Sequence, residues 1–172
     1  MKSKVEKKLF YLMTGEFVAS VLFAILWVVY IPLFDWSAEY LTSFPPIYAF
    51  FVLEFILLQG SLYWYLKWKR IKKKEASHLS LRQLKIFSYF KRVNFLLVGV
   101  GLIVLLYQVT QYSSGLYWFL FLYGFAAVEH INYYHVRLSY QSIEEIQEFI
   151  KQKGLRPSIL ARELKKQNER GF

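Results

Sequence analysis

Three glutamates, Glu16, Glu54 and Glu129, lie inside long apolar stretches of the sequence. An ionisable side chain within a membrane-spanning helix is costly, at about 2.5–3.5 kcal/mol for a charge at the helix centre, so each one is a candidate for function. Glu16 follows Lys8 by eight residues, and Glu129 precedes Arg137 by eight. At about 1.5 Å per helical residue, both carboxyl groups lie roughly 12 Å from the nearest charge. The sequence therefore predicts that they share one depth.

The other two apolar stretches carry polar or small residues at the same count from their nearest charge. Counting eight residues back from Lys67 reaches Gln59, which adjoins Gly60, and counting eight on from Arg92 reaches Val100, which lies between two glycines. Small residues let helices approach closely or leave space beside a neighbouring side chain. We therefore expect a polar pocket in which Gln59 adjoins the two carboxyl groups.

Further polar residues are expected nearer the charged end of these stretches. At about 100° per residue, Glu129, Asn132 and Tyr133 share one face of a helix, and His135 continues that face from Asn132. Asn94 and His135 each lie two residues from a terminal charge, which places them at a similar shallow depth. The pattern predicts a polar vestibule that opens toward the charged end.

Two interpretations of these buried polar groups stay open. Buried Glu, Gln and Asn side chains often hold neighbouring helices together through hydrogen bonds worth about 0.6 kcal/mol each. The same groups can also form a site for a ligand, a substrate or a proton. Glu54 is isolated and lies about 20 Å from the charged end, so we expect it to be a neutral packing residue.

Catalytic and metal-binding patterns are weak in this sequence. Glu129 and His135 could act as an acid and a base on a lipid substrate, but no obvious nucleophile accompanies them. His130 and His135 are five residues apart, about 140° around a helix, and do not readily chelate one ion. The chain has no cysteine, which excludes disulfides and thiolate chemistry. We expect no metal, no cofactor and a non-enzymatic function.

The elements that must position these groups are four apolar helices, at about residues 9–34, 46–66, 85–108 and 116–136. About 20 apolar residues span the roughly 30 Å hydrocarbon core, and backbone groups in lipid must be satisfied internally. All 22 Lys and Arg residues fall within residues 2–8, 67–92 and 137–170. By the positive-inside rule, both termini and the middle loop are cytoplasmic. The sequence thus predicts an all-α integral membrane protein with a four-transmembrane-helix bundle.

The bundle is expected to occupy residues 1–139, with a basic cytoplasmic loop at 67–84, and a cytoplasmic tail follows at 140–172. On the outer side, the short acidic segment from Asp35 to Ser43 leads to Pro45 and Pro46, which favour an extended entry into the second span. In the tail, the spacing predicts one amphipathic helix over 142–154 and a second that starts near Pro157. Deleting the residues from Ser142 to Phe172 is expected to abolish function while the spans still insert.

Five basic residues closely follow the second span: Lys69, Arg70, Lys72, Lys73 and Lys74. This position favours anionic lipid headgroups over nucleic acid. We expect a small multipass protein that acts through protein or lipid contacts, as a regulatory, protective or assembly subunit. The alternatives are an oligomeric proton-coupled transporter that uses the buried glutamates and a lipid-modifying enzyme. The expected location is a bacterial plasma membrane, and the expected partners are membrane lipids with a membrane protein or a second copy of the chain.

Overall fold

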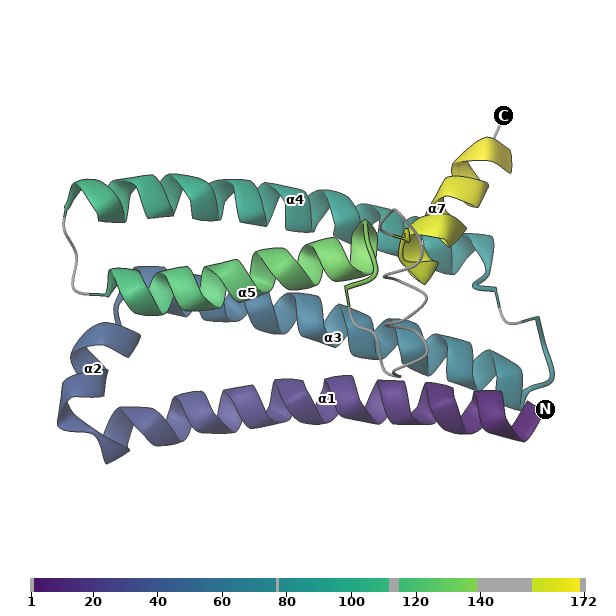
Figure 1. Ribbon diagram of the computed structural model, residues 1–172, viewed down its shortest axis with the longest axis horizontal. Coiled ribbons are helices and arrows are strands. Elements are labelled where there is room, and N and C mark those ends of the chain that lie inside the picture. The colour runs from purple at the N-terminus through teal and green to yellow at the C-terminus, as the bar shows by residue number, and fades with distance from the viewer. Residues whose placement is uncertain (1, 77, 112–114, 139–155, 171–172) are drawn as a thin grey trace.

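The computed structural model describes residues 2–76, 78–111, 115–138 and 156–170, and the regular structure in these ranges is helical (Figure 1). An isolated antiparallel bridge joins Val136 to Pro157. The helices are α1 (Lys2–Leu33), α2 (Asp35–Leu41), α3 (Phe44–Lys72), α4 (Leu81–Thr110), α5 (Leu116–Tyr134) and α7 (Ile159–Arg170). The first predicted tail helix, at residues 142–154, lies outside the described residues.

Among the described helices, α1, α3 and α4 are long and apolar enough to cross a membrane. The prediction of membrane-spanning helices is therefore confirmed for three of the four apolar stretches. Helix α5 is shorter, at 19 residues, and its last two turns contain Glu129, His130 and Asn132. These polar residues lower the hydropathy of a helix that is otherwise rich in leucine, phenylalanine and tyrosine.

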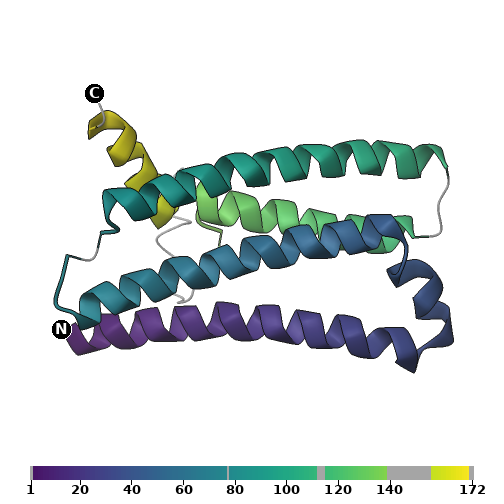
Figure 2. The same ribbon diagram turned by 180° about the vertical axis from the view of Figure 1, so that it is seen from behind.

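Helix α3 lies at the centre of the structure, in contact with α1, α4 and α5 (Figures 1 and 2). In its most apolar 18-residue window 56% of the residues are buried, against 6% for α1 and 17% for α4. Helix α1 packs chiefly along α3, where Trp27 stacks on Phe50 with ring centroids 4.5 Å apart. The outer faces of α1 and α4 are therefore open to lipid or to a partner.

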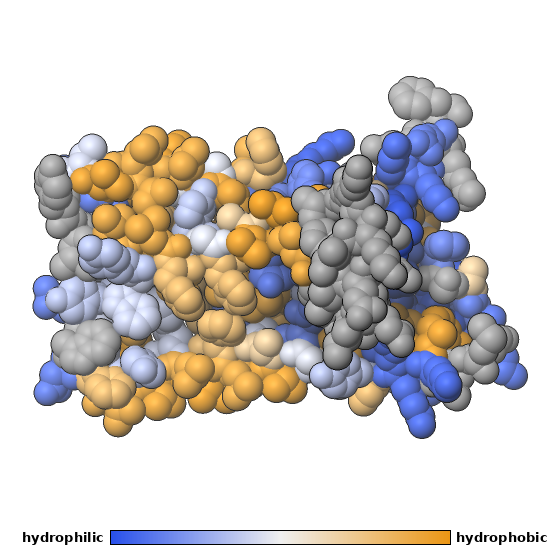
Figure 3. All heavy atoms as spheres, viewed as in Figure 1, coloured by the Kyte–Doolittle hydropathy of each residue, from blue (hydrophilic) through white to orange (hydrophobic). Residues whose placement is uncertain are grey.

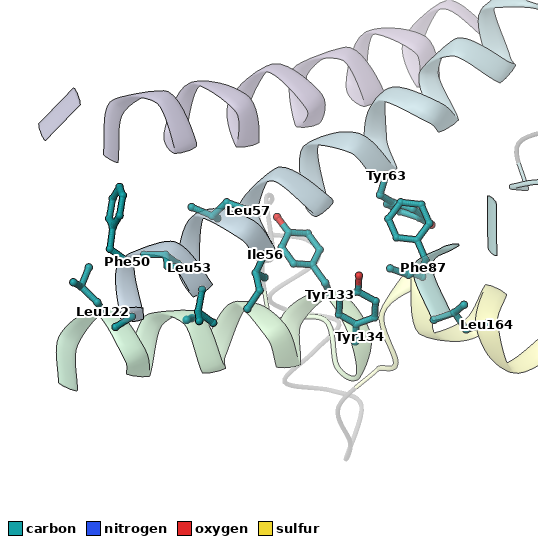
Figure 4. Close-up of a cluster of buried hydrophobic side chains, with 14 of the residues drawn as sticks. Phe50, Leu53, Ile56, Leu57, Tyr63, Phe87, Leu122, Tyr133, Tyr134 and Leu164 are labelled. Carbon is teal, nitrogen blue, oxygen red and sulfur yellow. The ribbon is translucent and has the colours of Figure 1, made fainter. Parts of the chain in front are cut away.

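The packing of α3 follows the helical period. Its buried residues include positions 49, 53, 56, 60, 63 and 67, which recur every three or four residues along one face. Leu53 and Ile56 meet Phe119, Leu122 and Ala126 of α5 in one apolar cluster (Figure 4). Between membrane helices such close packing, rather than exclusion of water, is the main source of attraction.

The segment between α1 and α3 differs from the expected irregular loop. Residues 35–41 form the short helix α2, and the buried hydroxyl of Ser37 donates to the carbonyl groups of Tyr30 at 2.7 Å and Phe34 at 2.8 Å. Helix α3 begins at Phe44, so Pro45 and Pro46 lie inside its first turn and only Ser43 is extended. Prolines fit there because the first N–H groups of a helix have no intrahelical partner.

The basic side chains gather toward one end of the helices. Figure 3 shows apolar side chains over the middle of the molecule and hydrophilic ones at the end where α1 begins and α7 lies. Helix α7 lies where the sequence predicts a second tail helix, and it buries Leu160 and Leu164 while Lys165 and Lys166 stay exposed. At this end Ser80 and Gln83 form a capping box at the start of α4.

Candidate functional site

Helix α7 is held across the end of α5 by backbone pairing. The N–H of Arg137 donates to the carbonyl of Arg156 at 2.9 Å, and the N–H of Ser158 donates to the carbonyl of His135 at 3.1 Å. The Ser158 hydroxyl donates to the Tyr133 carbonyl and accepts from the N–H of Ala161 at 3.0 Å. Ser158 is thus the N-cap of α7 and fixes where this helix starts.

A buried ion pair connects α7 to α3. Lys67 Nζ lies 2.9 Å from Glu163 Oε1, and the two side chains are 9% and 6% exposed. The Lys67 ammonium also donates to the Tyr63 hydroxyl at 3.3 Å, and His78 Nδ1 lies 3.4 Å from the same Glu163 oxygen. The sequence analysis does not predict this pair, because Lys67 has the position of the first charge outside a span and Glu163 is one of many polar residues in the tail.

A pocket of about 390 Å³ lies at this end, between α1, α3, the end of α5 and the start of α7. Its apolar walls come from Leu9 and Leu12 of α1, Trp64 of α3, and Ile159 and Leu160 of α7. Apolar side chains from three helices therefore face one space large enough for part of a small molecule or a lipid.

The polar lining of this pocket includes residues that the sequence singles out. Glu16, Asn132 and Tyr133 line it, together with the basic residues Lys8 and Arg137. The Glu16 carboxyl lies beside the Tyr133 hydroxyl. This hydroxyl forms no hydrogen bond with any group in the described ranges. The pocket therefore places carboxyl, amide, phenol and basic groups next to an apolar wall.

Glu129 lies close to this lining but not in it. Asn132 Nδ2 donates to Glu129 Oε2 at 3.2 Å, and Asn132 Oδ1 accepts from the N–H of Leu138 at 2.9 Å. Both carboxyl groups, Glu16 and Glu129, interact electrostatically with Tyr133. The structure thus brings the first and last apolar helices together through Tyr133, while the Asn132 amide holds the chain where it leaves α5.

Gln59 and Asn94 form a separate buried network. Gln59 Nε2 donates to Asn94 Oδ1 at 3.1 Å, and Asn94 Nδ2 donates to Gln59 Oε1 at 2.7 Å. The Tyr134 hydroxyl donates to the same Gln59 oxygen at 2.6 Å. These bonds link α3, α4 and α5, and each is worth about 0.6 kcal/mol between membrane helices. The network does not line the pocket, so its geometry matches the role of holding helices together.

Two of the glycines leave room for tyrosine rings of α5. A Cβ atom on Gly60 would overlap the ring of Tyr133, and one on Gly101 would overlap the ring of Tyr123. The Tyr123 hydroxyl donates to the Val98 carbonyl at 2.8 Å. The space that sequence reasoning expected beside Gly60 and Gly101 is therefore filled by tyrosines of α5. Gly99 instead faces open space.

Glu54 and His135 lie away from the pocket. The Ser20 hydroxyl donates to Glu54 Oε2, which joins α1 to α3, and Glu54 Oε1 has no hydrogen-bond partner among the described residues. His135 is exposed and its ring lies 5.4 Å from that of His130, beside α4. The structure thus divides the predicted site residues into a pocket, a buried network and two separate positions.

The basic residues at the end of α3 have varied surroundings. Arg70 pairs with Glu75 at 3.2 Å and donates from Nε to the Ala76 carbonyl at 3.1 Å. Lys69 and Lys72 lie over the rings of Tyr65 and Trp68, at 5.8 and 4.9 Å from the ring centroids. Lys73 and Lys74 are exposed just beyond the helix. Aromatic rings beside lysines are typical of a membrane–water interface.

The described residues contain no group of three or more His, Asp or Glu side chains placed to hold a metal ion. No protein-family model, curated protein or solved structure matches the chain.

Proposed function

We propose that this protein is a non-catalytic multipass membrane protein that binds one amphiphilic membrane component in the pocket between α1 and α7. It acts through that contact as a regulatory, protective or assembly subunit. The observation that carries this proposal is the joint lining of one space by Leu9 and Leu12, Glu16 and Arg137. Such a lining suits a molecule with an apolar body and a polar head.

The membrane arrangement that goes with this proposal is a four-helix bundle. Helix α5, at 19 residues, is about 28 Å long, close to the thickness of the hydrocarbon core, so it crosses beside α1, α3 and α4. The basic residues then lie on one side, with both termini in the cytoplasm. Exposed Lys73 and Lys74 face anionic headgroups there. The small outer connections favour a bacterial plasma membrane.

The pocket chemistry favours binding over catalysis. Ser158 is the one aliphatic hydroxyl in the described pocket lining; its oxygen accepts from Ala161 to cap α7, and its hydrogen is donated to the Tyr133 carbonyl of α5. An activated nucleophile needs an adjacent base and a free hydroxyl directed at the substrate. Ser158 has neither, so this lining holds no activated serine for a lipid-modifying reaction.

Transport is the second candidate, because Glu16 and Glu129 both interact with Tyr133. Two carboxyl groups around one phenol could carry a proton between them. This version requires a homo-oligomer, since α1 packs chiefly along α3 and leaves its other faces open. It would appear as solute-dependent proton flux across sealed vesicles, which a binding protein does not produce.

The binding proposal predicts that filling the pocket removes its ligand. Leu12 of α1 and Ile159 of α7 both line the pocket, so the double variant Leu12→Trp with Ile159→Trp should reduce the pocket volume sharply. We expect at least a roughly tenfold loss of the copurifying amphiphile, equivalent to about 1.4 kcal/mol of binding. The measurement is mass spectrometry of the protein extracted in native lipid discs.

The matched control is Leu22→Trp with Leu26→Trp, which adds the same bulk to exposed positions of α1. This control should keep the amphiphile at the wild-type level. Equal retention by both double variants, with unchanged thermal unfolding, would count against the proposed pocket.

A further inference from the structure

A second hollow lies on the surface between α4 and α5, away from the pocket. It is a groove of about 460 Å³, and it shares no lining residue with the pocket. Lys91, Arg92, Phe95 and Leu96 of α4 form one side, and His130 and His135 form the other. Because α4 and α5 contact each other, the groove has a floor made by both helices.

The charged end of this groove is basic. Lys91 lies close enough to both imidazole rings to interact electrostatically with them. No carboxylate lines the groove, and neither Lys91 nor Arg92 forms an ion pair with a carboxylate in the described ranges. Glu129, the nearest acid along α5, is bonded to Asn132 instead. Such a concentration of basic groups favours an anion.

The other end of the groove is apolar. Phe95 and Leu96 lie one helical turn beyond Lys91 and Arg92, and their side chains are 72% and 66% exposed. Further along the same helix, Gly99 faces open space and Ile103 is 67% exposed. The basic end therefore leads directly onto an uncovered apolar strip on a helix that is apolar enough to cross a membrane.

The buried polar group in the groove wall also lacks a partner. His130 is 6% exposed, and its Nδ1 atom makes no hydrogen bond to any group in the described ranges. Its ring lies 5.3 Å from that of Tyr134 and 5.4 Å from that of His135. The His130 ring thus forms part of the groove wall next to Lys91, and its unpartnered Nδ1 atom lies behind the groove surface.

We propose that this groove binds one anionic phospholipid, with its phosphate at Lys91, Arg92 and the histidines and an acyl chain along Phe95 and Leu96. Helix α4 has 30 residues and is about 45 Å long, which exceeds the hydrocarbon thickness. Counting about 30 Å, or roughly 20 residues, back from the end of α4 at Thr110 reaches Phe90, so Lys91 and Arg92 lie next to the boundary of the hydrocarbon core. Arginine and lysine at this depth bind phosphate through charge and hydrogen bonds. A membrane lipid is the occupant because a soluble phosphate would leave the adjoining apolar strip unused.

The test is retention of phosphatidylglycerol by protein reconstituted in discs of phosphatidylcholine with a small share of phosphatidylglycerol. Native mass spectrometry counts the lipids that stay bound after release from the disc. We expect one phosphatidylglycerol to be held by the wild-type protein. Lys91→Ala with Arg92→Ala should reduce its occupancy by roughly tenfold or more, since both basic groups contribute to binding the phosphate.

The matched control is Arg82→Ala with Lys85→Ala, which removes the same charges from exposed positions of α4 outside the groove. This control should retain the lipid. Lys91→Gln and Arg92→Gln, made singly, each test the site with a smaller change if the double variant unfolds, and each should lower the occupancy several-fold. Unchanged retention in the Lys91 and Arg92 variants would overturn the proposal. Displacement of the lipid by millimolar glycerol phosphate would overturn it too, because the site would then be one for a soluble phosphate.

Discussion

Replacing Glu163 by glutamine is expected to release α7 from the helices that it covers. The change leaves the Lys67 ammonium, which is 9% exposed, without its carboxylate partner. Removing one member of a buried ion pair costs on the order of 3–5 kcal/mol because the other charge stays buried and unpaired. His78 cannot replace the carboxylate, since its side chain carries no negative charge and is 70% exposed.

The release can be measured by cysteine labelling, since the chain contains no cysteine of its own. Leu160→Cys places a thiol at a position that is 3% exposed under α7. In the Glu163→Gln background, a water-soluble maleimide should label this thiol on the order of 100-fold faster, because roughly 3 kcal/mol of docking energy is lost.

Glu169→Gln is the matched control for this experiment. Glu169 pairs with Lys165 at 4.0 Å in a pair whose side chains are 62% and 80% exposed. Exposed pairs contribute little, so the labelling rate should change by less than about twofold. Replacing both partners, Lys67→Met with Glu163→Met, should restore protection, since no charge is then left unpaired. If Glu163→Gln leaves the labelling rate unchanged, the ion pair does not hold α7 in place.

A second large effect is expected from Gly60→Ala. The added Cβ would overlap the ring of Tyr133, which is buried against α3 and also lines the pocket. Figure 4 shows Tyr133 reaching from the last turn of α5 toward α3. Overpacking of this kind costs about 1–3 kcal/mol, so the unfolding temperature in detergent should fall and the pocket should lose its ligand.

Gly99→Ala is the matched control, because a Cβ there meets open space. It should leave stability unchanged or raise it by up to about 1 kcal/mol, the usual gain of alanine over glycine inside a helix. Combining Gly60→Ala with Tyr133→Leu should cost less than the sum of the two single changes, because the ring that clashes is gone. Equal effects of Gly60→Ala and Gly99→Ala would show that the helices do not approach as described.

The sequence predicts three membrane-spanning helices from local pattern. Runs of apolar residues between clusters of basic residues mark α1, α3 and α4. Of the polar residues that counting and helical spacing group together, Glu16, Asn132 and Tyr133 line the pocket, whereas Glu129 lies outside its lining. These predictions depend only on local periodicity and on charges at the ends of two helices.

The prediction that Val100 of α4 lies at the depth of Gln59 is wrong, for a physical reason. Gln59 meets Asn94 rather than Val100, a difference of six residues or about 9 Å along the helix. The count assumed that the first charge lies at the same depth on every helix. Arg92 breaks this assumption, because it lies only two residues, or about 3 Å, from the level where Asn94 meets Gln59, whereas Lys67 lies eight residues, or about 12 Å, from it. No local pattern signals this offset, nor the buried pair of Lys67 with Glu163, 96 residues away in sequence.

The same pair changes how the tail should be tested. Residues 158–160 of the tail line the pocket, and Glu163 compensates a buried lysine. Deleting the whole tail would therefore also disturb the packing of the helices, even if the spans still insert. Single substitutions such as Glu163→Gln separate a loss of docking from a loss of the chain that forms the pocket.

The most direct measurement of the central claim is photocrosslinking from inside the pocket in native membranes. A photoreactive side chain at Leu12 faces the pocket, while the same side chain at Leu26 faces outward from α1. After irradiation and extraction, mass spectrometry identifies the molecules attached at each position. We predict that position 12 captures one class of amphiphile enriched over its share of the membrane, whereas position 26 captures the bulk lipids. The same lipid distribution at both positions, or no adduct at position 12, would contradict the claim that the pocket binds a membrane component.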